Sequence, residues 1–167
     1  MVAGSISRWV LLAYRLPREP STPRIALWRK LRRLGAAQLQ DGLVALPLDA
    51  RTREQLEWLA EEVSEAGGEA AVWLAEPATA AQERALATRM AALVAKEYRV
   101  VLAAVEAARL QPEGPRRRTV ARLRRELRRI GQRDYFPPSE REQARAAVAE
   151  LASQLEARAE RAGRAAR

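Results

Sequence analysis

The alternation of apolar and polar positions over the first half of the chain predicts six short elements. Apolar runs of four to ten residues are typical of strands, and apolar residues three or four apart are typical of helices. Read this way, the sequence predicts a strand, a helix, a hairpin of two strands, a helix and a strand, at 7–16, 22–34, 36–40 with 43–46, 51–66 and 70–74. Asp41-Gly42 marks the hairpin turn, and Gly35 and Pro77 end elements of the series.

This order of elements is that of a ferredoxin-like βαββαβ domain, a four-stranded antiparallel sheet with two helices on one face. We therefore expect an α+β protein whose ferredoxin-like domain occupies residues 1–77. In the helix at 22–34 the wheel places Trp28 with Leu31 in the core, and Arg29, Lys30 and Arg33 opposite them.

Helical spacing continues through the second half and predicts a C-terminal extension, residues 78–167, of about three helices. The first runs from about 79 to 110, and Thr79 with Gln82 forms a candidate capping box at its start. Pro112, Gly114 and Pro115 end it. A helix at about 116–132 follows, then a corner at 134–138 and a final helix from Ser139.

The helix at about 116–132 is rich in arginine, with nine arginines between Arg116 and Arg133. Its apolar seam consists of Val120, Leu123, Leu127 and Ile130. Opposite the seam, a stripe of charges about 22 Å long would repel itself unless an anion lay against it. A phosphate backbone is such an anion, and the width of a helix suits the major groove of DNA.

The candidate nucleic-acid-binding residues therefore lie on two helices. They are Arg118, Arg122, Arg124, Arg125, Arg128, Arg129 and Arg133 on the second, and Arg29, Lys30 and Arg33 on the first. The other interpretation of the arginine-rich helix is a solvated face whose charges pair with the acidic helix at 54–65. The excess of arginine over lysine, 28 to 2, would also follow from a GC-rich genome.

Composition removes several classes of chemistry. The chain has no cysteine and no histidine, which excludes disulfides, thiolate nucleophiles, histidine bases and the usual zinc ligand sets. The aspartates form no pair and no glycine-rich phosphate loop is present, so we expect no metal site, no cofactor and no enzyme. With no long apolar stretch, we expect a cytoplasmic protein that does not enter the membrane.

Six short segments together resemble the N-terminal domain of the chromate-resistance regulator ChrB. They are Trp9-Val10-Leu11-Leu12 with Pro17, Trp28-Arg29-Lys30-Leu31 with Leu34-Gly35-Ala36, Leu39-Gln40-Asp41-Gly42, Gln55-Leu56-Glu57-Trp58-Leu59, Gly67-Gly68-Glu69-Ala70 and Arg133-Asp134-Tyr135-Phe136. The resemblance covers about residues 8–137 and implies a transcription regulator that binds double-stranded DNA at the promoter of a chromate efflux operon. Full-length members continue into a second domain, so chromate sensing through that domain is not carried over to this chain.

Two other functions stay open at this point. Chromate is a divalent oxyanion, and one or two partly buried arginines in a concave site would make an oxyanion sensor. A protein-interaction module without DNA affinity is the other form of this alternative. The fold class also resembles small dimeric CRISPR-associated endonucleases, but these need an aspartate where this chain has Ala13, Tyr14 and Arg15. We expect a homodimer.

Overall fold

The computed structural model describes residues 8–165, and the chain divides into two compact units, 1–90 and 91–167. This division falls inside a long helix, later in the chain than the 77/78 boundary that the sequence pattern predicts. Among the described residues, no helix combines the length and the apolar character that crossing a bilayer requires.

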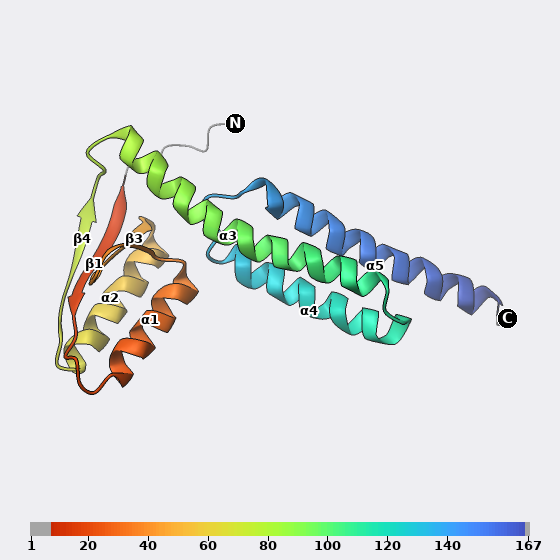
Figure 1. The fold of residues 1–167 in the computed structure, drawn as a ribbon, viewed down its shortest axis with the longest axis horizontal. Coiled ribbons are helices and arrows are strands. Elements are labelled where there is room, and N and C mark those ends of the chain that lie inside the picture. Colours follow the sequence, from red (N-terminus) through yellow and green to blue (C-terminus); the bar gives the residue numbers. More distant parts are fainter. Residues whose placement is uncertain (1–7, 166–167) are drawn as a thin grey trace. The chain divides into compact units, whose positions relative to one another are not determined.

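The first unit is a four-stranded sheet with two helices, α1 and α2, on one of its faces (Figure 1). Its elements are β1 (Trp9–Arg15), α1 (Thr22–Leu34), β2 (Ala37–Gln40), β3 (Leu43–Pro47), α2 (Ala50–Glu65) and β4 (Glu69–Ala75). The order of elements along the chain is the predicted one. The strands lie in the order β2-β3-β1-β4, and every neighbouring pair is antiparallel.

The two faces of the sheet carry different side chains because successive residues of a strand point to opposite sides. Val10 and Leu12 of β1 are fully buried on the face that α1 and α2 cover. Leu11 lies on the other face, in register with Ala45 of β3 and Trp73 of β4. The helices contribute Leu27, Leu31, Leu56, Leu59 and Val63 to the core.

Local chemistry sets the turns that join these elements. Gly42 has a φ of 73°, and a Cβ built there would lie 2.4 Å from the carbonyl oxygen of Tyr14, so only glycine fits the predicted hairpin turn. At the start of α2, the Asp49 carboxylate accepts from the Thr52 backbone N–H at 2.7 Å, and the Thr52 hydroxyl oxygen accepts from the Asp49 N–H at 3.0 Å. This reciprocal cap fixes the first turn of the helix.

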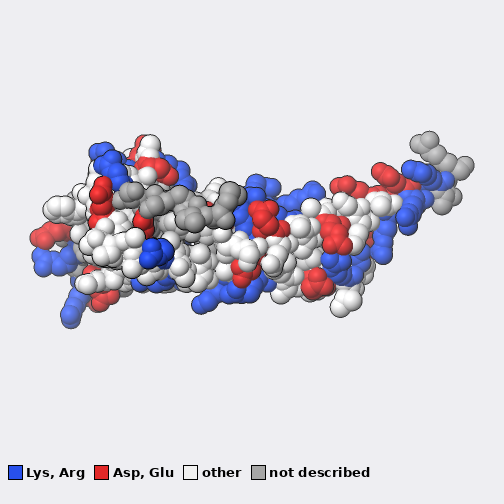
Figure 2. Space-filling view, turned by 90° about the horizontal axis from the view of Figure 1, so that it is seen from above, with Lys and Arg blue, Asp and Glu red and all other residues white. Residues whose placement is uncertain are grey.

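The second unit is built from the later part of α3 (Ala80–Arg109) with α4 (Glu113–Gly131) and α5 (Ser139–Ala165), which are the three predicted helices. Thr79 caps α3 by accepting from the Gln82 N–H at 3.1 Å. The three helices share one apolar core, to which α3 gives Val101 and Val105, α4 gives Leu123 and Ile130, and α5 gives Leu151. Acidic and basic side chains interleave on the face of this unit that Figure 2 shows, where α5 lies.

A buried carboxylate fixes the corner between α4 and α5. The side chain of Asp134 is fully buried, and it accepts from the Tyr98 hydroxyl at 2.8 Å. Arg141 lies 3.6 Å from the same carboxylate oxygen. Burial, together with the hydrogen bond to Asp134, raises the pKa of Tyr98 to about 12. The corner predicted at 134–138 is thus anchored to α3.

Candidate nucleic-acid interface

Helix α4 is strongly two-sided, as the sequence predicts. Val120, Leu123 and Ile130 are buried in the core of the second unit, and Leu127 packs against it. The opposite side, together with the flanks where Arg124 and Arg128 lie, carries arginines that are exposed to solvent. We call this set the arginine face; it consists of Arg118, Arg122, Arg124, Arg125, Arg128 and Arg129.

Five members of the arginine face have no side-chain hydrogen bond or ion pair with any residue in the part of the chain that the structure describes. The exception is Arg129, which lies 3.0 Å from Glu126 in an exposed pair three residues apart. From Arg118 to Arg128 the face extends about 15 Å along the helix axis, at 1.5 Å per residue. Its positive charge is therefore dense and largely uncompensated.

Arg133, also predicted to contact nucleic acid, lies apart from this face. Its side chain is only 16% exposed and forms a two-pronged ion pair with Glu97 of α3, with Nε 3.2 Å from one carboxylate oxygen and the second nitrogen on the other. It also donates to the carbonyl of Arg129 at 3.1 Å. In the structure this arginine links the end of α4 to α3.

The first two arginines of the run also have partners within the protein, Arg116 in a buried position and Arg117 on the surface. Arg116 is 7% exposed and donates to three backbone carbonyls at the end of α3, those of Ala108, Arg109 and Gln111, at 3.1, 2.9 and 2.7 Å. Arg117 pairs with Glu113 at 2.6 Å. Sequence reasoning missed the role of Arg116, although its spacing of four residues from Val120 places it on the apolar side of the helix.

Helix α1 carries the second predicted basic cluster, and the structure separates its members. Arg29 and Arg33 are exposed, with no side-chain partner among the described residues. Lys30 forms an ion pair with Glu62 of α2 at 2.5 Å. It therefore bridges the two helices, and its charge is partly compensated.

The prediction that Trp28 lies in the core is wrong. Its side chain is 50% exposed, and the guanidinium of Arg32 lies 4.8 Å from its ring centre. Leu27 and Leu31 fill the buried side of α1, which leaves Trp28 at the margin of that face. The indole lines an open surface hollow with Tyr14, Arg24, Ile25 and Arg29.

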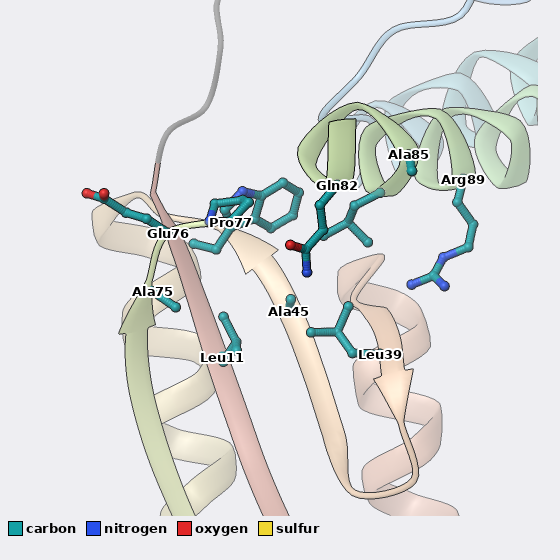
Figure 3. Close-up of a pocket in the computed structure, with 11 residues that line it drawn as sticks. Leu11, Leu39, Ala45, Ala75, Glu76, Pro77, Gln82, Ala85 and Arg89 are labelled. Atoms are coloured by element: carbon teal, nitrogen blue, oxygen red, sulfur yellow. The ribbon is translucent and has the colours of Figure 1, made fainter. Parts of the chain in front are cut away.

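A second hollow, of ≈ 430 Å³, lies on the other side of the sheet in the first unit (Figure 3). Leu11, Leu39 and Ala45 form its floor, and Gln82 and Ala85 of α3 face them. Arg89 reaches its rim but donates to the carbonyl of Gln38 at 2.9 Å. The lining is mostly apolar, and its polar members are Glu76, Gln82 and Arg89. The described residues do not include a group of three acidic side chains placed to hold a metal ion.

The comparison with protein families decides where the chain belongs. Residues 24–113, more than half of its length, match the family model described as Protein ChrB, N-terminal. The chain belongs to the ChrB N-terminal family. The resemblance that its sequence segments predict is thus confirmed.

A curated relative, Protein ChrB of Cupriavidus metallidurans (strain ATCC 43123 / DSM 2839 / NBRC 102507 / CH34), is 38% identical over 66 residues. The aligned part is 40% of this chain and 20% of that protein, so the chain covers a fifth of its relative's length. No solved structure matches the chain significantly.

The match to the ChrB N-terminal family covers the two basic regions unequally. Its 24–113 segment contains Arg29, Lys30 and Arg33 of α1 and ends at the first residue of α4. The arginine face therefore lies beyond the matched segment.

Proposed function

We propose that this member of the ChrB N-terminal family binds double-stranded DNA through the arginine face of α4, as a cytoplasmic regulator of chromate resistance. One observation carries the proposal. Five exposed arginines with no side-chain partner among the described residues follow one side of a helix whose other side is held in a three-helix core. Phosphates spaced along a DNA backbone would offset the mutual repulsion of these charges.

Arginine suits this role because its planar guanidinium makes paired hydrogen bonds with phosphate oxygens, or with O6 and N7 of guanine. Most of the contacts would go to phosphates and set the position of the helix on the duplex. Arg29 and Arg33 of α1 are further candidates for phosphate contacts. The resemblance to ChrB supports the proposed regulatory role in chromate resistance.

We also infer that the first unit belongs to the ferredoxin-like class. The strand order β2-β3-β1-β4, the antiparallel pairing of all neighbours and the crossovers through α1 and α2 support this class. This inference concerns the fold alone, because one fold of this class can host many functions.

Oxyanion sensing has less support than DNA binding. A buried oxyanion site needs arginines that are partly buried and unoccupied. In the described part of the second unit, the three least exposed arginines are Arg116, Arg133 and Arg141, and all contact carbonyls or carboxylates. The hollow beside Arg122 is lined by Glu97 and Glu126, whose charge disfavours an anion.

The test measures affinity for a DNA duplex at several salt concentrations. With five or six phosphates contacted, the slope of log affinity against log salt should be about −4.5 to −5.5, from roughly −0.9 per phosphate. The variant Arg122→Gln/Arg125→Gln/Arg128→Gln removes three charges while keeping good helix formers, so its slope should be shallower by about 2.7.

A control variant removes the same charge from other exposed positions, as Arg84→Gln/Arg158→Gln/Arg161→Gln. It should keep most of the slope. No duplex binding at low salt, or equal losses in the two variants, would overturn the proposal for the arginine face. Stabilisation by chromate beyond that by chloride of equal ionic strength would instead support the oxyanion function.

A further inference from the structure

The two edges of the sheet are built differently. Strand β2, at one edge, has four residues and an irregular register between Gln38 and Gln40. Its Gln38 carbonyl accepts from Arg89. Short strands, bulges and covering side chains are the usual means by which proteins keep an edge from pairing with another chain.

Strand β4, at the other edge, has none of these protections. It has seven residues, pairs with β1 in regular register from Glu69 to Ala75, and contains no lysine or proline. Its one charged side chain, Glu69, is at its end and pairs with Arg15 at 3.0 Å. No backbone hydrogen bond joins its outer edge to another described residue.

Two large apolar side chains on this strand are exposed. Trp73 is 60% exposed on the sheet face that carries Leu11, and Leu74 is 45% exposed on the opposite face. Apolar area next to an unpaired strand edge favours association with another strand.

We propose that a second copy of this chain pairs with β4, strand to strand and antiparallel, about a twofold axis at Val72, so that two four-stranded sheets form one sheet of eight strands. Such an interface uses the same patch on both copies. The proposal does not depend on DNA binding, since it uses a different surface and needs no arginine of α4.

The geometry of strand pairing determines the register. Directly opposed residues in an antiparallel pair point to the same face of the sheet, so the axis of the dimer must pass through a residue. Of the possible centres, Val72 alone lets all seven residues of β4 pair. Centring on Ala71 or Trp73 leaves two residues of each strand unpaired.

The sizes of the side chains fit this register. With Val72 opposite Val72 of the second copy, Trp73 lies opposite Ala71 on one face and Leu74 opposite Ala70 on the other. Each large exposed side chain thus meets a small one. The Glu69 carboxylates are at opposite ends of the paired strands, about 20 Å apart at 3.3 Å per residue, so they do not repel strongly. This self-complementarity favours a second copy over an unrelated strand.

The absence of cysteine from the chain makes a direct test possible. The variant Val72→Cys should form a disulfide-linked dimer on mild oxidation, because its two thiols would face each other across the axis. Glu69→Cys and Ala75→Cys should each fail to cross-link alone. A one-to-one mixture of these two variants should cross-link, since residues 69 and 75 of opposite copies are paired in this register.

Light scattering on the unmodified chain should give the mass of a dimer, and Trp73→Lys should give a monomer with an unchanged circular dichroism spectrum. A monomeric mass at high concentration would overturn the proposal. A dimer in which neither Val72→Cys nor the mixed pair cross-links would also overturn it. Loss of DNA binding by the α4 variant with the dimer intact would bear on the proposed function alone.

Discussion

The guanidinium of Arg116, near the start of α4, donates its Nε hydrogen to the backbone carbonyl of Ala108, which lies in the last turn of α3. The last four carbonyls of a helix have no partner within the helix. Here the Arg116 guanidinium donates to the carbonyls of Ala108 and Arg109, and also to that of Gln111, which follows the helix. The link explains how a residue in the densest run of positive charge comes to be buried.

Replacing Arg116 should therefore destabilise the protein. We expect Arg116→Ala to lower the free energy of unfolding by about 2–4 kcal/mol, since three charge-assisted hydrogen bonds are lost and, among the described residues, only the carbonyl of Ala108 keeps another donor, the Gln111 N–H. Urea denaturation measures this change. Arg118→Ala, two residues later and exposed, is the control and should change it by less than about 0.5 kcal/mol. Equal effects would contradict the role of Arg116.

Variants of Arg133 and Arg125 should have opposite effects, one on the stability of the protein and the other on its binding to DNA. Arg133→Gln breaks the partly buried pair with Glu97, and we expect it to cost about 1–3 kcal/mol of unfolding free energy without changing the salt slope of duplex binding. Arg125→Gln should do the reverse, with a slope shallower by about 0.9 and unchanged stability. A shallower slope for Arg133→Gln would place this arginine back among the phosphate contacts.

The hydroxyl of Tyr98 should make stability depend on pH in alkaline solution. Its pKa is raised from 10.0 to about 12 in the folded protein, so the folded state binds the proton more tightly than the unfolded state. The stabilisation is fully present below pH 10 and should be lost as pH rises from 10 to 12. Denaturation curves across this range should fall more steeply for the wild type than for Tyr98→Phe. Parallel curves would argue against the burial of this hydroxyl and its hydrogen bond to Asp134.

Two tryptophans should respond oppositely to substitution. Trp9 is 2% exposed, and Trp9→Ala should cost about 3–5 kcal/mol by creating a cavity. Trp28→Ala should cost less than about 1 kcal/mol, because half of this side chain is already in water. Thermal unfolding with calorimetric enthalpies would give both values. A large loss of unfolding free energy in Trp28→Ala would show that this side chain belongs to the core.

The order of helices and strands could be predicted from the sequence because the period of the apolar positions is a local property. The continuous apolar run of β1, the Asp41-Gly42 turn and the seam from Val120 to Ile130 each depend on neighbours within a few residues, and the structure contains all three. The misassigned positions depend on distant partners. Trp28 has the spacing of a core residue, but Leu27 and Leu31 occupy the available space, and no local rule ranks the three.

The candidate site shows the same limit. Helical periodicity identified the exposed side of α4, yet it could not separate Arg133 from Arg129, because the partner of Arg133 is Glu97, which lies 36 residues earlier on another helix. Arg116 is different, since its spacing from Val120 was visible in the sequence. Arg116 was interpreted as part of the charged run, although its position on the helix indicates the apolar side.

The seam of α4 has a consequence for the thermodynamics of association. A segment as rich in like charges as 116–133 would not hold a helix by itself in water, because formation of a short helix is barely favourable even without repulsion. Packing against α3 and α5 preforms the helix, so its arginines meet a ligand in a fixed arrangement. Association should then lack the large negative heat-capacity change that accompanies folding upon binding.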